Sequence, residues 1–205
     1  MSEIPIDVAV EDQLSEQVVL KLLEVANRSF HVGTTYRRGG FGYLRRTING
    51  WNAAAKGRPF IVLTDLDDGK CPSALIAEWL TSDIHPNLIF RIAVREVEAW
   101  LLADSENLAT YLRISAKHLP GDPDSLSDPK ASLIDLAKRS RASDVRANLV
   151  PRPGSTAKQG PGHNEFLGAF VQRKWDVRAA AEQSRSLKRA LSRIEDFQPI
   201  WTREG

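Results

Sequence analysis

Hydrophobic and polar positions follow two different periods along the first half of the chain. Residues 4–10 place isoleucine or valine at every second position, which predicts a strand. Residues 60–63 and 88–94 are short apolar runs, typical of parallel strands that helices cover on both faces. A fourth, shorter strand is indicated over residues 29–33. The pattern therefore predicts a mainly buried sheet.

Apolar side chains spaced three and four residues apart predict helices between and after these strands. Ser15 is the predicted N-cap of the first helix, and another helix is expected to carry Glu96 and Glu98. Strand and helix thus alternate, which favours a parallel sheet with right-handed crossovers. The first helix covers residues 16–26, and the other predicted helices cover residues 44–55, 73–79, 131–137 and 177–194.

A stretch rich in Pro, Gly, Asp and Ser, residues 119–129, divides the chain. We expect an α/β domain over residues 1–118, with a Rossmann-like parallel sheet flanked by helices. Residues 119–205 are expected to form a helical extension that packs on the same core. At 205 residues the chain is too short for two full domains.

Composition narrows the class of protein. The hydrophobic fraction of 42% and the net charge of +2 are ordinary for a globular protein, and no apolar run approaches the roughly 20 residues of a membrane span. The N-terminal residues contain no secretion signal, so the cytoplasm is expected. Cys71 is the only cysteine, which excludes an intrachain disulfide and a thiolate zinc cluster, and we interpret it as structural.

Acidic residues follow three of the predicted strands. Glu11 follows the first, Asp65 and Asp67 follow the central one, and Glu96 and Glu98 follow the next. The carboxyl ends of parallel strands meet at one edge of a sheet, so these side chains are expected to converge. The Asp-x-Asp spacing puts both aspartates on one face if the strand continues. Clustered carboxylates need compensating charge, and hard oxygen ligands suit Mg²⁺ or Mn²⁺. Besides Glu11, Asp65 and Asp67, we expect Glu98 to be a further ligand of the metal ion, with Glu96 as the alternative.

Two segments with this acidic pattern resemble the Toprim domain of topoisomerases, primases and OLD-family nucleases. They are residues 10–16, Val-Glu-Asp-Gln-Leu-Ser-Glu, and residues 64–67, Thr-Asp-Leu-Asp. Residues 95–104 are also similar to the glutamate-alanine-tryptophan signature of Toprim-like proteins, some of them encoded beside ATPases in phage defence. The resemblance covers about residues 4–104.

The resemblance implies a Mg²⁺-dependent nuclease or related phosphodiester-processing enzyme, with nucleic acid as substrate and an ATPase as partner. It assigns Glu11 to acid/base work or metal binding, and Asp65 and Asp67 to metal binding; these three are the expected catalytic residues. The chain departs from the family at Asp12, where a glycine normally stands, and Glu16 lies one residue further on than usual. Whether the nucleic acid is DNA or RNA stays open, and so does the oligomeric state of the protein.

Two other functions remain open. A non-catalytic binding or regulatory subunit would keep the fold without the chemistry, which Asp12 favours. Residues 65–69 are also similar to the motif of haloacid-dehalogenase phosphatases, in which Asp65 would be the nucleophile and Asp67 the general acid. That motif has a glycine where this chain has Asp68. Each acid, taken alone, also suits a helix cap or a solvated loop.

Basic residues in two glycine-containing loops are candidate contacts with nucleic acid. The first loop, residues 34–43, combines arginines with Phe41, which suits a phosphate backbone and a stacked base. The second, residues 151–158, could bind phosphate through amides and cations, and His163 nearby could join a site. Solvated loops are the alternative for both. The predicted contacts are Arg37, Arg38, Arg45, Arg152 and Lys158.

Overall fold

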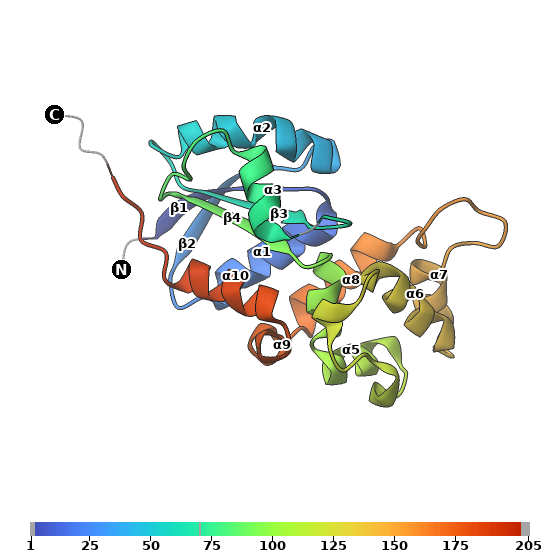
Figure 1. Ribbon diagram of the computed structural model, residues 1–205. Helices are drawn as coiled ribbons and strands as arrows, with labels where there is room; N and C mark the ends of the chain where they lie inside the picture. The colour runs from blue at the N-terminus through green and yellow to red at the C-terminus, as the bar shows by residue number, and fades with distance from the viewer. Residues whose placement is uncertain (1–2, 70, 202–205) are drawn as a thin grey trace.

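A four-stranded parallel sheet forms the centre of the protein (Figure 1). The computed structural model describes residues 3–69 and 71–201. The strand order is β2-β1-β3-β4. The predicted α/β class, a Rossmann-like parallel sheet flanked by helices, is confirmed. The strands are β1 (Ile4–Val10), β2 (Phe30–Tyr36), β3 (Phe60–Asp65) and β4 (Leu88–Ala93).

Helices cover both faces of the sheet (Figure 1). One face packs on α2 and α3 through a cluster that includes Leu44, Trp51 and Trp79. The other packs on α1, α4 and the C-terminal helices. The α-helices are α1 (Gln13–Val25), α2 (Gly40–Ala54), α3 (Pro72–Trp79), α4 (Val97–Leu102), α5 (Ser105–Leu112), α6 (Pro129–Arg139), α7 (Ser143–Leu149), α8 (His163–Arg173), α9 (Val177–Gln183) and α10 (Arg185–Glu195). Two 3-10 turns are η1 (Ala116–His118) and η2 (Pro123–Ser125).

The C-terminal helices share one hydrophobic core with the sheet. A single cluster of buried side chains joins β1, α1 and α4 to α6–α10. Trp100 of α4 is fully buried in it, and its indole Nε1 donates to Ser186 Oγ of α10 at 2.6 Å. The domain boundary after residue 118 stays a prediction, but the sheet and the extension bury their apolar surface together.

Several element boundaries differ from those predicted. Helix α1 begins at Gln13 because the side chain of Asp12, not Ser15, is its N-cap: Asp12 Oδ1 accepts from Ser15 N at 2.9 Å. Strand β2 extends to Tyr36, and α2 begins after Gly39, whose φ of 72° suits glycine. The expected loop over 34–43 is therefore only residues 37–39.

The expected helix over 177–194 is two helices. Ser184 ends α9, and its hydroxyl accepts from Leu187 N at 3.2 Å to cap α10. One serine does not interrupt the spacing of apolar residues, so that spacing predicted a single continuous helix across Ser184. The short helices α5, α7 and α8 were not predicted. No helix in the described ranges has the length and apolar character that crossing a bilayer requires.

Candidate active site

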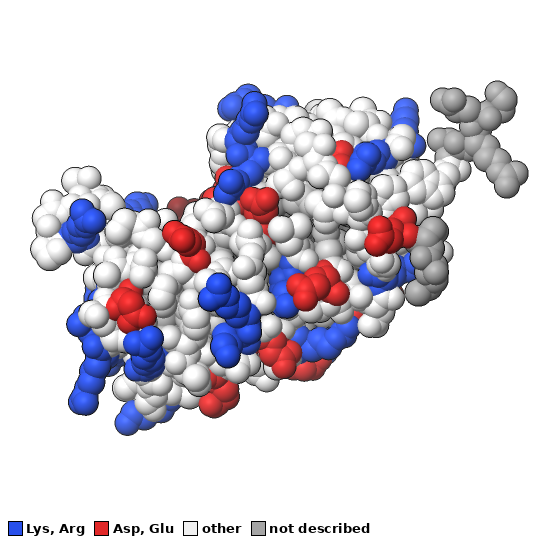
Figure 2. Space-filling model, turned by 180° about the vertical axis from the view of Figure 1, so that it is seen from behind, with Lys and Arg blue, Asp and Glu red and all other residues white. Residues whose placement is uncertain are grey.

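The predicted acidic residues gather where β1 and β3 end, against the beginnings of α4, α6 and α8. Figure 2 shows acidic side chains in the hollow between the sheet lobe and the C-terminal helices, with Lys and Arg side chains on either side of it. The site is therefore built from both halves of the chain.

Glu11 lies directly against the end of β3. Its Oε1 accepts hydrogen bonds from Asp65 N at 3.0 Å and from the hydroxyl of Thr64. Burial raises the pKa of Glu11, and the charges of Asp67 and Asp12 raise it further, while the two hydrogen bonds oppose the rise. These contacts join residues that are 54 positions apart in the sequence.

Asp65, the last residue of β3, is nearly buried, with 9% of its surface exposed. Its Oδ1 accepts from Val97 N at the start of α4, at 3.0 Å. Burial raises the pKa of Asp65 well above its usual range, and the charges of Glu98 and Glu11 add to this. A carboxyl held beside two others is a site where a cation would be stabilised.

Asp67 does not continue the strand. Strand β3 ends at Asp65, and Asp67 has a φ of 47°, so the expectation that both aspartates share a strand face is wrong. The chain turns because Leu66 N and Asp67 N both donate to Arg95 O, at 2.8 and 3.0 Å. Asp67 still belongs to the cluster, since partial burial, Asp68 and Glu98 raise its pKa against the opposing charge of Lys130.

Glu98 is fully buried and contacts two basic side chains from the C-terminal helices. Its Oε1 lies 3.0 Å from His163 Nε2 and 3.5 Å from Lys130 Nζ. Its Oε2 has no hydrogen-bond partner among the residues described. Burial would raise the pKa of Glu98, but the hydrogen bond to His163 and the charge of Lys130 outweigh it, so the pKa is lowered.

Glu96 has a different position from Glu98. It is the N-cap residue of α4, and its Oε2 accepts from Lys130 N, at the first turn of α6, at 2.9 Å. Its Oε1 accepts from Lys130 Nζ at 3.2 Å. Both oxygens of Glu96 are thus used in holding α6, whereas Glu98 keeps one oxygen free for a ligand. The geometry favours Glu98 as the added ligand.

Lys130 is the central residue that sequence reasoning missed. Burial alone would lower its pKa, but the charges of Glu98, Glu96 and Asp65 raise it above the usual lysine value. Lys130 lies in the first turn of α6, where the helix dipole disfavours a cation. That mismatch was a signal in the sequence that this lysine serves a partner outside its own helix.

The donor chemistry of the cluster fits a hard divalent cation, although the side chains as placed do not enclose one. Within residues 3–69 and 71–201, no group of three or more His, Cys, Asp or Glu side chains is arranged to hold a metal ion. The unpartnered Glu98 Oε2 and the raised pKa of Asp65 nevertheless mark negative charge that Lys130 only partly offsets. Glu11, Asp65, Asp67 and Glu98 are the residues that would hold Mg²⁺ or Mn²⁺.

Asp12, at the position where the Toprim pattern has a glycine, has a structural role in this chain. Besides capping α1, its Oδ2 accepts from Asn164 Nδ2 of α8 at 3.2 Å. The departure from the Toprim pattern thus coincides with a contact to the C-terminal extension.

The basic residues predicted to contact nucleic acid are dispersed. Arg37 pairs with Glu16 at 3.2 Å and Arg45 with Glu78 at 2.7 Å. Arg38 and Arg152 are exposed. Lys158 is near enough to the cluster for its charge to lower the pKa of Asp67. Of the five, Lys158 is the one that the structure connects to the acidic site.

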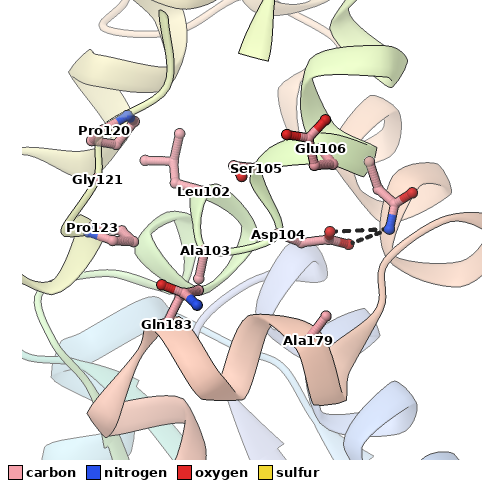
Figure 3. A pocket seen from close by; sticks show the side chains of 11 residues that line it. Leu102, Ala103, Asp104, Ser105, Glu106, Pro120, Gly121, Pro123, Ala179 and Gln183 are labelled. Carbon is pink, nitrogen blue, oxygen red and sulfur yellow. Dashed lines mark hydrogen bonds between the residues drawn. The ribbon is translucent and has the colours of Figure 1, made fainter. Parts of the chain in front are cut away.

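A separate cavity of about 480 Å³ lies where α4, α5 and α9 meet (Figure 3). Asp104 lines it, and its carboxylate accepts from Asn107 Nδ2, at 3.0 and 3.1 Å, and from Asp176 N at 2.7 Å. These bonds connect α5 to the start of α9. Asp104 is therefore a structural carboxylate, and both of its oxygens accept hydrogen bonds.

Comparison of the chain with known proteins identifies no relative. No family model, curated protein or solved structure matches it. Function is therefore inferred from the geometry of the acidic cluster.

Proposed function

We propose that the protein is a Toprim-like, Mg²⁺- or Mn²⁺-dependent nuclease or related phosphodiester-processing enzyme. The observation that carries the proposal is the convergence of Glu11, Asp65 and Glu98 at the carboxyl ends of adjacent parallel strands. In such a sheet, this edge is where ligands bind. The pKa of Asp65 is raised by burial and by both neighbouring carboxylates, which is the electrostatic condition that a divalent ion relieves.

The roles of the side chains follow from their surroundings. A divalent ion bound by these carboxylates would supply an activated water and offset charge on the departing oxygen. Glu11, with its raised pKa, is suited to accept a proton from the attacking water. Lys130 carries a fixed positive charge beside the cluster and would offset part of the charge on a phosphate.

The test is cleavage of nucleic acid by the purified full-length chain. Single- and double-stranded DNA and RNA are incubated with Mg²⁺ or Mn²⁺, and products are resolved on denaturing gels. Glu11→Gln and Asp65→Asn should each reduce the rate on the order of 10³-fold or more, because the carboxylates act as a unit. Asp135→Asn, a change at an exposed residue of α6, is the matched control and should cleave normally.

The proposed partners are nucleic acid and an ATPase, and the proposed compartment is the cytoplasm. If the wild-type chain leaves all four substrates intact with either metal, both alone and with an ATPase encoded beside it, the nuclease proposal is wrong.

A non-catalytic binding or regulatory subunit is the second candidate, and one observation favours it. Lys130 already offsets part of the negative charge that a metal would otherwise compensate. Calorimetric titration with Mn²⁺ decides between the two. Binding that disappears in Asp65→Asn would count against the non-catalytic alternative, whereas no binding would support it.

The phosphatase alternative stays a prediction. It requires an aspartyl-phosphate at Asp65, whose carboxylate is nearly buried and accepts from Val97 N. Mass spectrometry after incubation with a small phosphate ester would detect that intermediate, and its absence together with the absence of hydrolysis would remove the alternative.

A further inference from the structure

A groove lined by arginines lies beside β4 and contains none of the residues of the acidic cluster. It is a cavity of about 630 Å³ between β4, α10 and the beginning of α3. An adjoining hollow of about 420 Å³ shares Arg91 and Arg189 and extends the groove along α10 to Arg193. We call the four residues Arg91, Arg185, Arg189 and Arg193 the arginine groove.

Secondary structure explains why these four side chains meet. Arg185, Arg189 and Arg193 are spaced four residues apart on α10, so they form one stripe along the helix. Arg91 has the same parity on β4 as Ile89 and Ala93, whose side chains belong to the core on the α10 side of the sheet. Figure 1 shows α10 running beside the sheet close to β4.

The positive charge of the groove is not neutralised from within the described ranges. No carboxylate there lies within 4.0 Å of the guanidinium of Arg91, Arg185 or Arg189. Arg91 Nε is buried and donates to no partner among the described residues. Burial lowers the pKa of Arg91, and the charges of Arg193 and Arg189 lower it further. A buried, unpaired donor among like charges is costly unless an anion accepts from it.

Two acidic residues also line the groove, and both are already hydrogen-bonded to residues of α10 or its N-cap. Asp124 accepts from Ser184 Oγ at 2.6 Å and from Ser186 N at 3.1 Å. Asp196 accepts from Ser192 Oγ at 3.2 Å. These contacts hold the ends of α10, and neither carboxylate pairs with Arg91, Arg185 or Arg189. Arg193 in addition donates to Pro86 O at 3.2 Å and lies over the ring of Phe197, 5.7 Å from its centroid.

We propose that the arginine groove binds the phosphate backbone of a nucleic-acid strand. The stripe from Arg185 to Arg193 is about 12 Å long, which exceeds a single phosphate and suits successive phosphates of a strand. Guanidinium groups bind phosphate oxygens through two parallel hydrogen bonds, so arginine is the residue type best suited to this ligand.

This inference rests on the proposed function, because the strand held here would be the substrate of the acidic cluster. The two sites share their connecting loops. Cys71 and Val94, which line the groove, flank the turns that carry Asp67 and Glu96. Arg95 joins these turns, since its Nη1 donates to Asp67 O at 2.8 Å.

Binding is measured separately from cleavage. Fluorescence anisotropy of a labelled single-stranded oligonucleotide is recorded with full-length protein in EDTA, over a series of salt concentrations. Arg185→Ala/Arg189→Ala changes two exposed side chains and should weaken binding about tenfold or more. The slope of log affinity against log salt concentration should fall by about 0.7 for each phosphate that the variant no longer binds. Lys117→Ala/Arg141→Ala removes the same charge from exposed positions elsewhere and should bind like the wild type.

Cys71 gives a second readout at the groove itself. It is the only cysteine of the chain, it is exposed, and it lines the groove. Bound oligonucleotide should slow its alkylation in the wild type and not in Arg185→Ala/Arg189→Ala. Inorganic phosphate and a nucleoside triphosphate at equal phosphate concentration should protect it less than the oligonucleotide does.

The outcomes separate this inference from the proposed function. Unchanged affinity in the arginine double variant, or equal protection of Cys71 by the triphosphate, overturns the strand-binding role whatever the cleavage assay shows. Asp65→Asn should still bind the oligonucleotide in EDTA. If it binds normally and the wild type does not cleave, the nuclease proposal fails while the groove assignment stands.

Discussion

At the scale of single residues, the central feature is that the surroundings of Asp65 disfavour the charged form of its carboxyl. Its carboxyl is buried between Glu11 and Glu98, and both raise its pKa. In the unfolded chain its pKa returns to about 3.8. Between these two pKa values the folded state binds more protons than the unfolded state, so the stability that this group contributes falls as pH rises.

Asp65→Asn should therefore stabilise the fold at neutral pH. The amide keeps an oxygen that can accept from Val97 N, and it carries no charge. We expect a gain on the order of 1 kcal/mol at pH 7, or roughly 2–4 °C in Tm for a chain of this size. The gain should shrink as pH falls through the raised pKa of Asp65 towards 3.8. Thermal unfolding followed by circular dichroism at several pH values measures it; a Tm lowered at pH 7 would contradict the electrostatic account.

Lys130→Met tests the positive charge at the cluster. It leaves Glu96 and Glu98 without their ammonium partner. Because Glu98 is buried, loss of the partly buried lysine should cost about 3 kcal/mol at neutral pH. If a metal can replace the ammonium group, Mn²⁺ should raise the Tm of Lys130→Met more than that of the wild type. Equal shifts in Tm, or no shift in either protein, would argue against a metal at this position.

At the scale of elements, the N-cap residue of helix α1 also makes a contact with a distant helix. Asp12 caps the helix through Oδ1 and contacts Asn164 of α8 through Oδ2. A glycine at this position, as in the Toprim pattern, could provide neither contact. Asp12 therefore connects the start of α1 to the C-terminal extension.

Asp12→Gly and Asp12→Asn separate these contributions. Asparagine caps helices about as well as aspartate, and its NH2 group can donate to Asn164 Oδ1 once the amide of Asn164 turns over. The free energy of unfolding of Asp12→Asn should therefore be close to that of the wild type. Asp12→Gly should lower the free energy of unfolding by about 1 kcal/mol, because it removes both the side-chain cap and the hydrogen bond from Asn164. Urea denaturation measures both variants. Equal stability of the two would show that neither hydrogen bond contributes.

At the scale of the whole molecule, the C-terminal helices complete both the core and the site. Helix α6 carries Lys130 and α8 begins with His163, so the basic groups that face Glu98 come from residues beyond 118. The same helices cover Trp100, which is fully buried against Ser186. The acidic cluster thus lies at the junction of the two halves of the chain.

A fragment of residues 1–118 should not fold on its own. Removing α6–α10 would expose α1, α4 and one face of the sheet, which form one hydrophobic cluster with those helices. We expect the fragment to lack a cooperative thermal transition, whereas the full chain shows one. Circular dichroism melts of both test this. A sharp transition in the fragment would establish residues 1–118 as an independent domain.

Local patterns along the chain were enough to predict the parallel sheet and the edge at which the acids lie. Period-two and apolar runs specify strands, and a parallel sheet places all carboxyl ends at one edge, so Glu11 and Asp65 were found from their positions alone. Boundaries were less accurate where side-chain caps decided them, as at Asp12 and Ser184.

The surroundings of these acids, in contrast, depend on tertiary packing. Lys130 lies 34 positions from Glu96, and His163 lies 65 positions from Glu98. Their pairing depends on how α6 and α8 pack against the sheet, and local periodicity carries no information on that packing. Arg91 likewise meets the stripe on α10 because burial of the shared core brings the last helix alongside β4. Contacts between distant side chains follow from the shape of the whole core, which no local pattern encodes.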